Sequence, residues 1–481
     1  MSRYLGNVWD ATERYAYVKL ITKVSPYQLV AIKDGNRYIL GVVGSIKVKD
    51  TTVDPTRGGV EPWIYAEVNT EQPIIAYVQF LYEVRDNNIV QEVQYPPDIG
   101  SGVYEVGGDL FGKVIGALYV EPLHIGSLRN STLPFYLEGK YLPYHIGIFG
   151  ATGTGKSKLA VVLAREAKKR GYKVIAFDHS GMDYVPYLDR EVVESSRIKI
   201  PADTIGTVLA KLAGVYNNKA ESYHLAIIIA ADLYTKVLEG TYTDNYLKQL
   251  VKDIKDTSKL KILVERISKV GRYDPSIFIE LSQYVASIIS RTDVSVRLGI
   301  YMNKPSVRRF IESLNNRVLD PNTLIGKNVI IDLSTDVELD VKQSIVHQIL
   351  DTLWYKKLYE GDESRYLVIV DEAQNYASHY WENSVCYELL NKTAREGRKY
   401  NICLMLISQK YKDIDTSIRN NLNTLFIGRM YNIWEVEEIL PRKGISEYLT
   451  TLGNREFVVH GVANPLRQPV VIRTKDIQII H

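Results

Sequence analysis

The residues with the clearest chemistry form a glycine-rich loop near residue 150. The loop reads Gly150-Ala151-Thr152-Gly153-Thr154-Gly155-Lys156-Ser157, follows an apolar run and opens a helical pattern, so it satisfies the motif G-x-x-x-x-G-K-[ST]. In such a loop backbone N–H groups surround the β-phosphate of a nucleotide, the lysine neutralises the β and γ oxygens, and the serine hydroxyl binds Mg²⁺. The loop therefore predicts a site for ATP and Mg²⁺, with Lys156 as a catalytic residue and Ser157 as a metal ligand.

Two carboxylates follow another apolar run later in the chain. Asp371 and Glu372 come directly after Leu367-Val368-Ile369-Val370, which places both at the carboxyl edge of a predicted sheet, where α/β proteins bind ligands. We expect Asp371 to hold Mg²⁺ through its water shell and Glu372 to polarise the attacking water. Acidic residues often end strands, so the pair indicates a Walker B motif because the phosphate-binding loop is also present.

Further polar residues are candidates for the same site. Gln409 follows a buried run and could hydrogen-bond the γ-phosphate or the attacking water, or it is only a surface turn residue. Arg395 and Arg398 lie near the end of a predicted helix; they are candidate catalytic residues, and their alternative role is to complement the helix dipole. Asp178 and Asp183 follow another predicted strand at the same edge. Two interpretations are open for them: contact with Mg²⁺, water or DNA-facing loops, or a simple turn.

The elements expected to position these residues alternate between strand and helix. A buried strand over 145–149 precedes the loop, an amphipathic helix over 156–170 follows it, and Gly171 ends that helix. Apolar strands separated by helical stretches indicate an α/β fold with a mostly parallel sheet covered on both faces. The other predicted strands of this sheet are 173–177, 328–333, 366–370, 402–407 and 424–427.

The pattern along the chain divides it into parts. Short extended runs with a hairpin signal at Asp34-Gly35-Asn36 predict a small antiparallel β-barrel at the N-terminus. The helical stretch between the second and third strands of the α/β part is too long for an ordinary crossover, so we interpret it as an insertion. The predicted bounds are 1–110 for the barrel, 111–140 for a Gly- and Pro-rich connector, 141–481 for the α/β core, about 185–325 for the insertion and about 455–481 for a C-terminal tail.

Composition excludes several classes of protein. The chain has 481 residues, 46% hydrophobic and 24% charged, which excludes disordered, collagen-like and coiled-coil proteins. The net charge is only +3, so a nucleic-acid surface must be local; residues 248–272, with eight basic and three acidic side chains, form either such a surface or a solvated helical face. Two cysteines exclude a disulfide framework, and no apolar run is long enough to span a bilayer, so we expect a soluble, cytoplasmic protein.

Together these motifs resemble the archaeal HerA-type ATPases of the HerA/FtsK superfamily. The resemblance rests on the phosphate-binding loop, Val370-Asp371-Glu372-Ala373-Gln374-Asn375, Arg395-Glu396-Gly397-Arg398-Lys399-Tyr400 and Ser408-Gln409, and it extends to 452–458 and a late strand at 469–472. It implies a RecA-like P-loop ATPase core with a helical insertion, preceded by a HAS-barrel-like domain that docks a partner. It also implies a homohexameric ring with double-stranded DNA in its pore, which feeds or unwinds DNA for a NurA-type nuclease in end resection and repair.

The resemblance also implies roles for individual residues. Lys156, Asp371 and Glu372 would be the hydrolytic residues, Gln409 the sensor, and Arg398 an arginine finger that reaches the γ-phosphate of a neighbouring subunit. Gln374 stands where many relatives carry His. Two other functions remain open from the sequence: a DNA pump for exchange, packaging or conjugation, and a nucleotide-switched assembly factor. Glu372 favours the motors over the switch, because a switch does not require a catalytic carboxylate.

Overall fold

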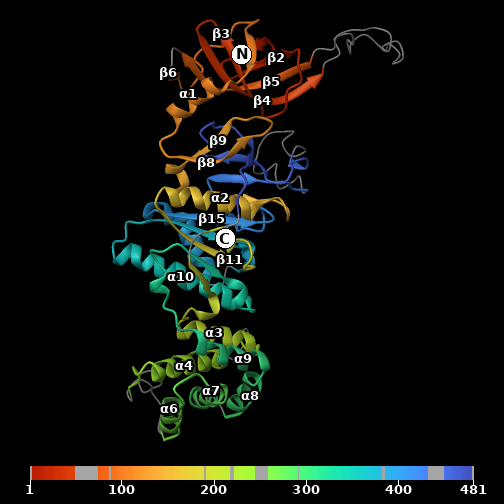
Figure 1. The fold of residues 1–481 in the computed structure, drawn as a ribbon. Helices are drawn as coiled ribbons and strands as arrows, with labels where there is room; N and C mark the ends of the chain where they lie inside the picture. Colours follow the sequence, from red (N-terminus) through yellow and green to blue (C-terminus); the bar gives the residue numbers. More distant parts are fainter. Residues whose placement is uncertain are drawn as a thin grey trace, which may run out of the picture.

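The computed structural model shows three parts arranged along one axis, an N-terminal barrel, a central sheet with helices, and a cluster of helices at the far end (Figure 1). Residues 244–257 lie outside the described structure, so only 258–272 of the basic segment can be assigned a conformation. The described residues are 3–48, 74–85, 88–90, 92–188, 191–216, 221–243, 258–290, 292–381, 385–431 and 449–478.

The N-terminal part is a closed antiparallel β-barrel, as the sequence predicts. Its strands are β1 (Tyr4–Ala11), β2 (Tyr15–Leu20), β3 (Leu29–Asp34), β4 (Arg37–Val48), β5 (Ile74–Arg85) and β7 (Gly102–Glu105), and β6 (Asn88–Val90) pairs with β5. They pair in the order β2-β1-β7-β3-β4-β5, and pairing of β2 with β5 closes the barrel. Leu5, Val18 and Ile39 are fully buried inside, because alternate side chains of each strand point inward.

Within the described residues the central sheet contains seven parallel strands, of which the sequence predicts six; β12 was not predicted. They are β12 (Glu191–Glu194), β13 (Val329–Asp332), β11 (Tyr172–Asp178), β14 (Arg365–Val370), β15 (Ile402–Ser408), β10 (Ile146–Phe149) and β16 (Thr424–Ile427), in that spatial order. Helices α2 (Lys156–Lys169), α10 (Leu339–Tyr359), α11 (Val385–Glu396) and α12 (Thr416–Arg419) connect or flank them. β14 and β15 are buried almost throughout, which explains why they read as continuous apolar runs.

The segment expected to be a connector, 111–140, is instead mostly regular structure. It contains most of α1 (Gly108–Leu118), all of β8 (Pro122–Leu128) and β9 (Pro134–Glu138), and the start of η2 (Gly139–Tyr144). β8 and β9 join β17 (Glu456–Gly461) and β18 (Val470–Thr474) as an antiparallel extension of the central sheet beyond β16. Pairing of β18 with β8 supplies the partner that makes these short strands stable, and a strand partner more than 300 residues away cannot be read from local composition.

The insertion predicted at about 185–325 begins with the strand β12, but its remaining part up to β13 is mainly helical, as predicted, and lies at the end of the molecule opposite the barrel (Figure 1). Its helices are α3 (Ala202–Ala213), α4 (Glu221–Leu238), α6 (Ser258–Val270), α7 (Pro275–Ile289), α8 (Thr292–Met302) and α9 (Pro305–Ser313). A buried ion pair of 2.6 Å between Arg317 and Asp336 joins the end of the insertion to the segment after β13. Among the described helices, none is both long and apolar enough to cross a membrane.

Short 3₁₀ helices complete the connections. They are η3 (Ser195–Arg197), η4 (Leu314–Asn316), η5 (Pro321–Thr323), η6 (Leu333–Thr335), η7 (Ala373–Asn375), η8 (His379–Trp381) and η9 (Gly397–Tyr400). Two of them matter for function: η7 begins directly after the predicted Walker B pair, and η9 leads from α11 into β15.

Candidate nucleotide-binding site

The glycine-rich loop joins the end of β10 to the start of α2, as its motif requires. Gly150, Gly153 and Gly155 have φ of +152°, +78° and +92°, a backbone region that favours glycine. A side chain at Gly155 would also meet Cγ of Arg455 at 3.0 Å and Oδ1 of Asn454 at 3.1 Å. The loop therefore needs glycine at this position both for its conformation and for its packing against the segment before β17.

Lys156 is folded across the loop. Its Nζ donates hydrogen bonds to the carbonyl oxygens of Gly150 at 2.9 Å and Ala151 at 3.2 Å. Burial lowers the pKa of Lys156, and the negative charges of Glu372, Asp371 and Asp183 oppose that effect. The ammonium group thus lies between the loop and the carboxylates, in the region where the motif places the β- and γ-phosphates.

The Walker B pair lies beside this loop because β14 and β10 both pair with β15 in parallel register. Asp371 follows β14 and is buried, and its Oδ1 accepts a hydrogen bond of 3.0 Å from the backbone N–H of Glu372. Glu372 has φ of +46° and ψ of +47°, a left-handed conformation that a non-glycine residue adopts at an energetic cost. The structure therefore brings Lys156, Asp371 and Glu372 together, as the sequence predicts.

Two more carboxylates belong to this site. The carboxylate oxygens of Asp178, Asp183 and Asp371 lie within 4.8 Å of one another. Asp178 ends β11, and its side chain accepts hydrogen bonds from the backbone N–H groups of Gly181 at 2.9 Å and Tyr184 at 3.1 Å. Those bonds fold the following turn back over the sheet edge and so bring Asp183 to Asp371. Both residues were expected at this edge, with a simple turn as an equal alternative.

The residues fit Mg²⁺. Burial, together with the neighbouring charges of Asp183, Glu372 and Asp178, raises the pKa of Asp371 to about 8. A divalent cation would relieve that repulsion, and carboxylate and hydroxyl oxygens are the ligands that Mg²⁺ prefers. Asp371 and Ser157 are the predicted metal ligands, and Asp183, for which contact with Mg²⁺ was one of the alternatives, is an additional oxygen donor.

Gln409 lies at the same edge. In the parallel pairing of β10 with β15, Ser408 is opposite Phe149, so Gln409 comes level with the first residue of the glycine-rich loop. Its side chain is exposed. The neighbouring Ser408 is buried and donates a hydrogen bond of 2.9 Å to Oε1 of Gln374, whose amide in turn donates to the Glu372 carboxylate. From the sequence, Gln374 stands out only as a departure from the family pattern, because a contact between side chains leaves no local sequence signal.

Arg395 and Arg398 do not lie at this edge. Arg395 is in the last turn of α11, and Arg398 is in η9, directly before the amino end of β15. The guanidinium group of Arg398 lies 3.7 Å from the ring centroid of Tyr144, which precedes β10. Because the parallel strands run from the edge that carries Arg398 towards the edge that carries the glycine-rich loop, Arg398 lies across the sheet from the nucleotide site of its own subunit.

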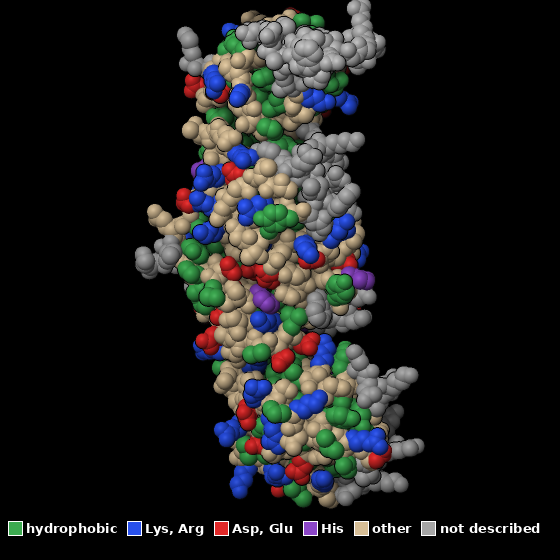
Figure 2. Space-filling view, turned by 90° about the vertical axis from the view of Figure 1, so that its right-hand side faces the viewer, with side chains coloured by type: hydrophobic (Ala, Val, Ile, Leu, Met, Phe, Trp, Pro, Cys, Tyr) green, Lys and Arg blue, Asp and Glu red, His purple; other side chains and the backbone are tan. Residues whose placement is uncertain are grey.

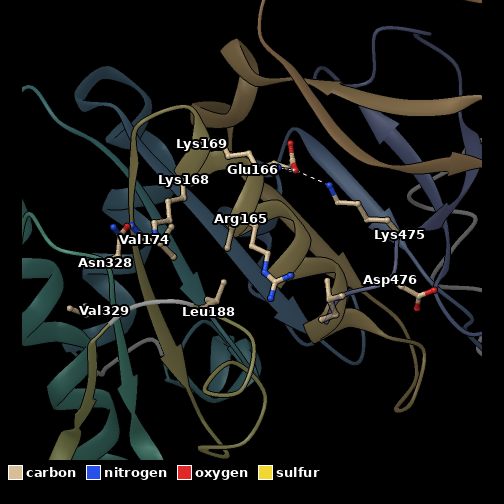
Figure 3. Close-up of a pocket in the computed structure, with 12 residues that line it drawn as sticks. Arg165, Glu166, Lys168, Lys169, Val174, Leu188, Asn328, Val329, Lys475 and Asp476 are labelled. Carbon is tan, nitrogen blue, oxygen red and sulfur yellow. Dashed lines mark hydrogen bonds and ion pairs between the residues drawn. The ribbon is translucent and has the colours of Figure 1, made fainter. Parts of the chain in front are cut away.

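A cavity of about 560 Å³ lies elsewhere on α2 (Figure 3). Its walls include Ala164 and Arg165 from the second half of the helix, Val174 from β11, and Lys475 and Ile477 after β18. Arg165 is held there by hydrogen bonds to the carbonyl oxygens of Tyr187 and Gln478. The wall begins eight residues after Lys156, about 12 Å along the helix axis, so this cavity is separate from the nucleotide site.

Charged side chains are dispersed over the described residues of one face of the molecule. On the face shown in Figure 2, Lys and Arg side chains are scattered among acidic ones along the whole length of the molecule. Within the described part of the basic segment, Arg266 forms an ion pair of 2.5 Å with Glu280, and Nζ of Lys259 lies 6.0 Å from the ring centroid of Tyr284. These contacts favour the solvated helical face for the two residues involved.

Comparison with known proteins identifies relatives over most of the chain. Residues 123–353 match the family described as "Helicase HerA, central domain". The chain is 22% identical to the DNA double-strand break repair helicase HerA of Sulfurisphaera tokodaii, over 97% of this chain and 91% of that protein. It is 23% identical to a probable helicase of Methanocaldococcus jannaschii, over 86% of this chain and 82% of that protein.

A solved structure agrees on the fold. VirB4 of Thermoanaerobacter pseudethanolicus matches 74% of this chain and 96% of its own, with a TM-score of 0.51 and 15% sequence identity. That likeness confirms the predicted RecA-like α/β core and says nothing of function. Together, the matching family and the relatives confirm the resemblance drawn from the motifs. The chain is therefore an ATP-hydrolysing enzyme that resembles the HerA helicases over most of its length.

Proposed function

We propose that this enzyme is an ATP-dependent translocase on double-stranded DNA that works as a hexameric ring and feeds DNA to a NurA-type nuclease in end resection. The observation that carries the proposal is the meeting of Lys156, Asp371 and Glu372 at one edge of the sheet, which supplies the parts of a hydrolysing motor. Relatives over most of the chain that carry the name of DNA double-strand break repair helicase support DNA as the track.

The described residues divide the chemistry between them. Lys156 exchanges its bonds to the loop carbonyls for phosphate oxygens, which are stronger acceptors because they are charged. Ser157 and Asp371 would hold Mg²⁺, which neutralises charge on the β and γ oxygens when bound. Glu372 orients the attacking water and accepts its proton, and Gln409 senses the γ-phosphate from the end of β15.

Arg398 supports a shared active site. It lies across the sheet from the nucleotide site of its own subunit, so it can stabilise the transition state only at a site of a neighbouring subunit. A ring of head-to-tail subunits brings the two edges together at every interface, because such contacts are heterologous and close by rotation. The N-terminal barrel, at the opposite end from the helical insertion, is the proposed platform for the nuclease.

The test compares wild type with Lys156→Ala and Glu372→Gln in ATP hydrolysis, ATP binding and displacement of a triplex-forming strand from linear duplex DNA. We expect duplex DNA to stimulate wild-type hydrolysis and ATP to drive strand displacement. Lys156→Ala should lose ATP binding, whereas Glu372→Gln should bind ATP and lower kcat by about 10²- to 10⁴-fold, the usual contribution of a general base. Lys158→Ala and Glu388→Gln, at exposed positions on α2 and α11, are matched controls and should behave as wild type.

Three outcomes would contradict the proposal. Hydrolysis that is indifferent to duplex DNA, without strand displacement, would favour the nucleotide-switched assembly factor. Full turnover by Glu372→Gln would remove Glu372 from its role. A single subunit that hydrolyses ATP at the rate of the assembled protein, judged by sedimentation at the assay concentration, would exclude a site shared between subunits.

A further inference from the structure

The Glu372 carboxylate is connected to the central sheet by hydrogen bonds through the side chains of Gln374 and Ser408. The Gln374 amide donates from Nε2 to Oε2 of Glu372 and accepts at Oε1 a hydrogen bond of 2.9 Å from Oγ of Ser408. Ser408 is the last residue of β15 and is buried, whereas Glu372 and Gln374 lie in the turn that begins after β14. The chain of bonds therefore crosses from this turn to the strand that pairs with the glycine-rich loop's own strand, β10.

The two hydrogen-bond partners of Gln374, Glu372 and Ser408, fix the orientation of its amide. A glutamine amide has a donor end and an acceptor end, and a carboxylate can only accept. If the Gln374 amide were reversed, its carbonyl oxygen would face the Glu372 carboxylate, and two negative oxygens would repel each other. Donation from Ser408 to Oε1 adds to this preference, because it holds the oxygen on the side away from Glu372.

Glu372 needs such support. A glutamate side chain has three rotatable bonds, so the position of its backbone does not by itself fix where its carboxylate lies. Glu372 follows β14, which pairs with β15, and β15 pairs with the strand that leads into the glycine-rich loop, so the carboxylate that Gln374 holds belongs to the edge of the sheet that carries this loop. The bond occupies one carboxylate oxygen, and we expect the other to accept from the attacking water.

We propose that Gln374 is a positioning residue that holds the Glu372 carboxylate towards the nucleotide, and that Ser408 acts through Gln374 by fixing the orientation of its amide. The inference rests on the proposed role of Glu372 in hydrolysis. Gln374 itself contacts the general base and not the substrate, so its removal should affect the chemical step and leave ground-state nucleotide binding unchanged.

The experiment measures kcat and KM for ATP, in the presence of saturating duplex DNA, on full-length Gln374→Met, Gln374→His and Ser408→Ala. Met matches the size of Gln without its hydrogen bonds, so kcat should fall about tenfold, the value of one lost hydrogen bond, with KM within twofold of wild type. His keeps an N–H donor, so it should recover part of the lost kcat. Gln28→Met, a half-buried glutamine in the barrel, is the matched control and should leave basal hydrolysis unchanged.

A double-mutant cycle separates positioning from a merely structural role. Ser408→Ala should lower kcat severalfold in the wild-type background and have no further effect when Gln374 is already Met, because Ser408 acts only through the amide. Thermal unfolding of each variant checks the fold; if Gln374→Met is unstable, Gln374→Asn, which is one methylene too short to span both partners, replaces it.

The results distinguish failure of the inference from failure of the proposed function. Wild-type kcat in folded Gln374→Met, or fully additive losses in the cycle, would overturn the positioning role of Gln374. The proposed role of Glu372 in hydrolysis would still stand if Glu372→Gln loses activity. A rise in KM without a change in kcat would also overturn it, because that result means a contact to bound ATP. Full turnover by Glu372→Gln would instead remove the basis on which both claims stand.

Discussion

Arg398 offers a direct test of whether each ATP site is built from two subunits. It precedes the amino end of β15, and the nucleotide site lies at the carboxyl end of the same strand. β15 has 7 residues, which span about 23 Å at about 3.3 Å per residue. That length is far beyond the reach of an arginine side chain, so any contribution of Arg398 to hydrolysis must come at a neighbouring subunit.

The perturbation is to mix two inactive variants. Arg398→Ala alone should lose about 10³- to 10⁵-fold in kcat because it lacks the arginine finger, and Glu372→Gln alone should lose about 10²- to 10⁴-fold because it lacks the general base. In a ring, a site with the nucleotide-binding edge of an Arg398→Ala subunit and the arginine of a Glu372→Gln subunit contains every wild-type group. Random assembly at equal amounts makes about a quarter of the interfaces of this kind, because each interface joins two different edges.

The rings of the two variants are dissociated into subunits by high dilution, and the subunits are mixed and reassembled. The assay is then steady-state ATP hydrolysis by the reassembled rings. We expect recovery to about a quarter of wild-type activity if sites fire independently, and less if they must fire in order. Two different affinity tags confirm that mixed rings form. No recovery in rings shown to be mixed, or wild-type activity in Arg398→Ala alone, would refute the shared site.

Two further predictions concern the stability of the core and the shape of the glycine-rich loop. His145 is buried, its Nδ1 accepts a hydrogen bond of 3.0 Å from the N–H of Leu404, and burial lowers its pKa from 6.5 to about 4. His145 therefore takes up a proton at a higher pH in the unfolded chain than in the folded one, and the free energy of unfolding should fall by up to about 3 kcal/mol as the pH drops from 6.5 to 4. Urea unfolding of His145→Gln should lack this fall. A free energy of unfolding of His145→Gln that depends on pH as the wild type does would contradict the prediction. Gly155→Ala should weaken binding of a fluorescent ATP analogue more than Gly153→Ala, because both have positive φ but only a Cβ at Gly155 meets atoms within 4 Å, and equal losses would show that packing against Arg455 is irrelevant.

Much of the site was predictable because it depends on strand order. Parallel strands end at one edge, so a glycine-rich loop after β10, two carboxylates after β14 and a polar residue after β15 must come together once the sheet forms. The apolar runs that predict those strands are buried on both faces, which makes them visible in the sequence. Arg398 lies far from its own nucleotide site for the same physical reason, because this residue precedes a strand of the sheet and does not follow one.

Other features depend on pairing between distant segments. The closure of the barrel requires β2 to pair with β5, and the extension of the central sheet requires β8 to pair with β18. Local composition indicated strands in the first case and a connector in the second, because Gly and Pro in the short strands β8 and β9 weaken the strand signal. Packing of Asn454 and Arg455 against Gly155 joins residues about 300 positions apart and likewise leaves no trace in either local sequence.

Residues placed by strand order and residues placed by side-chain contacts differ in whether their roles can be carried over from relatives at 22% identity. Groups fixed by backbone position, such as Lys156 at the start of α2 and Asp371 at the end of β14, keep their place whenever the sheet is kept. A support such as Gln374 is chosen by what it touches, here Ser408 on one side and Glu372 on the other, and a different pair of side chains could hold the same carboxylate. Variation at position 374 is therefore expected to be matched by variation at position 408, whereas the groups that bind phosphate and metal have no such freedom.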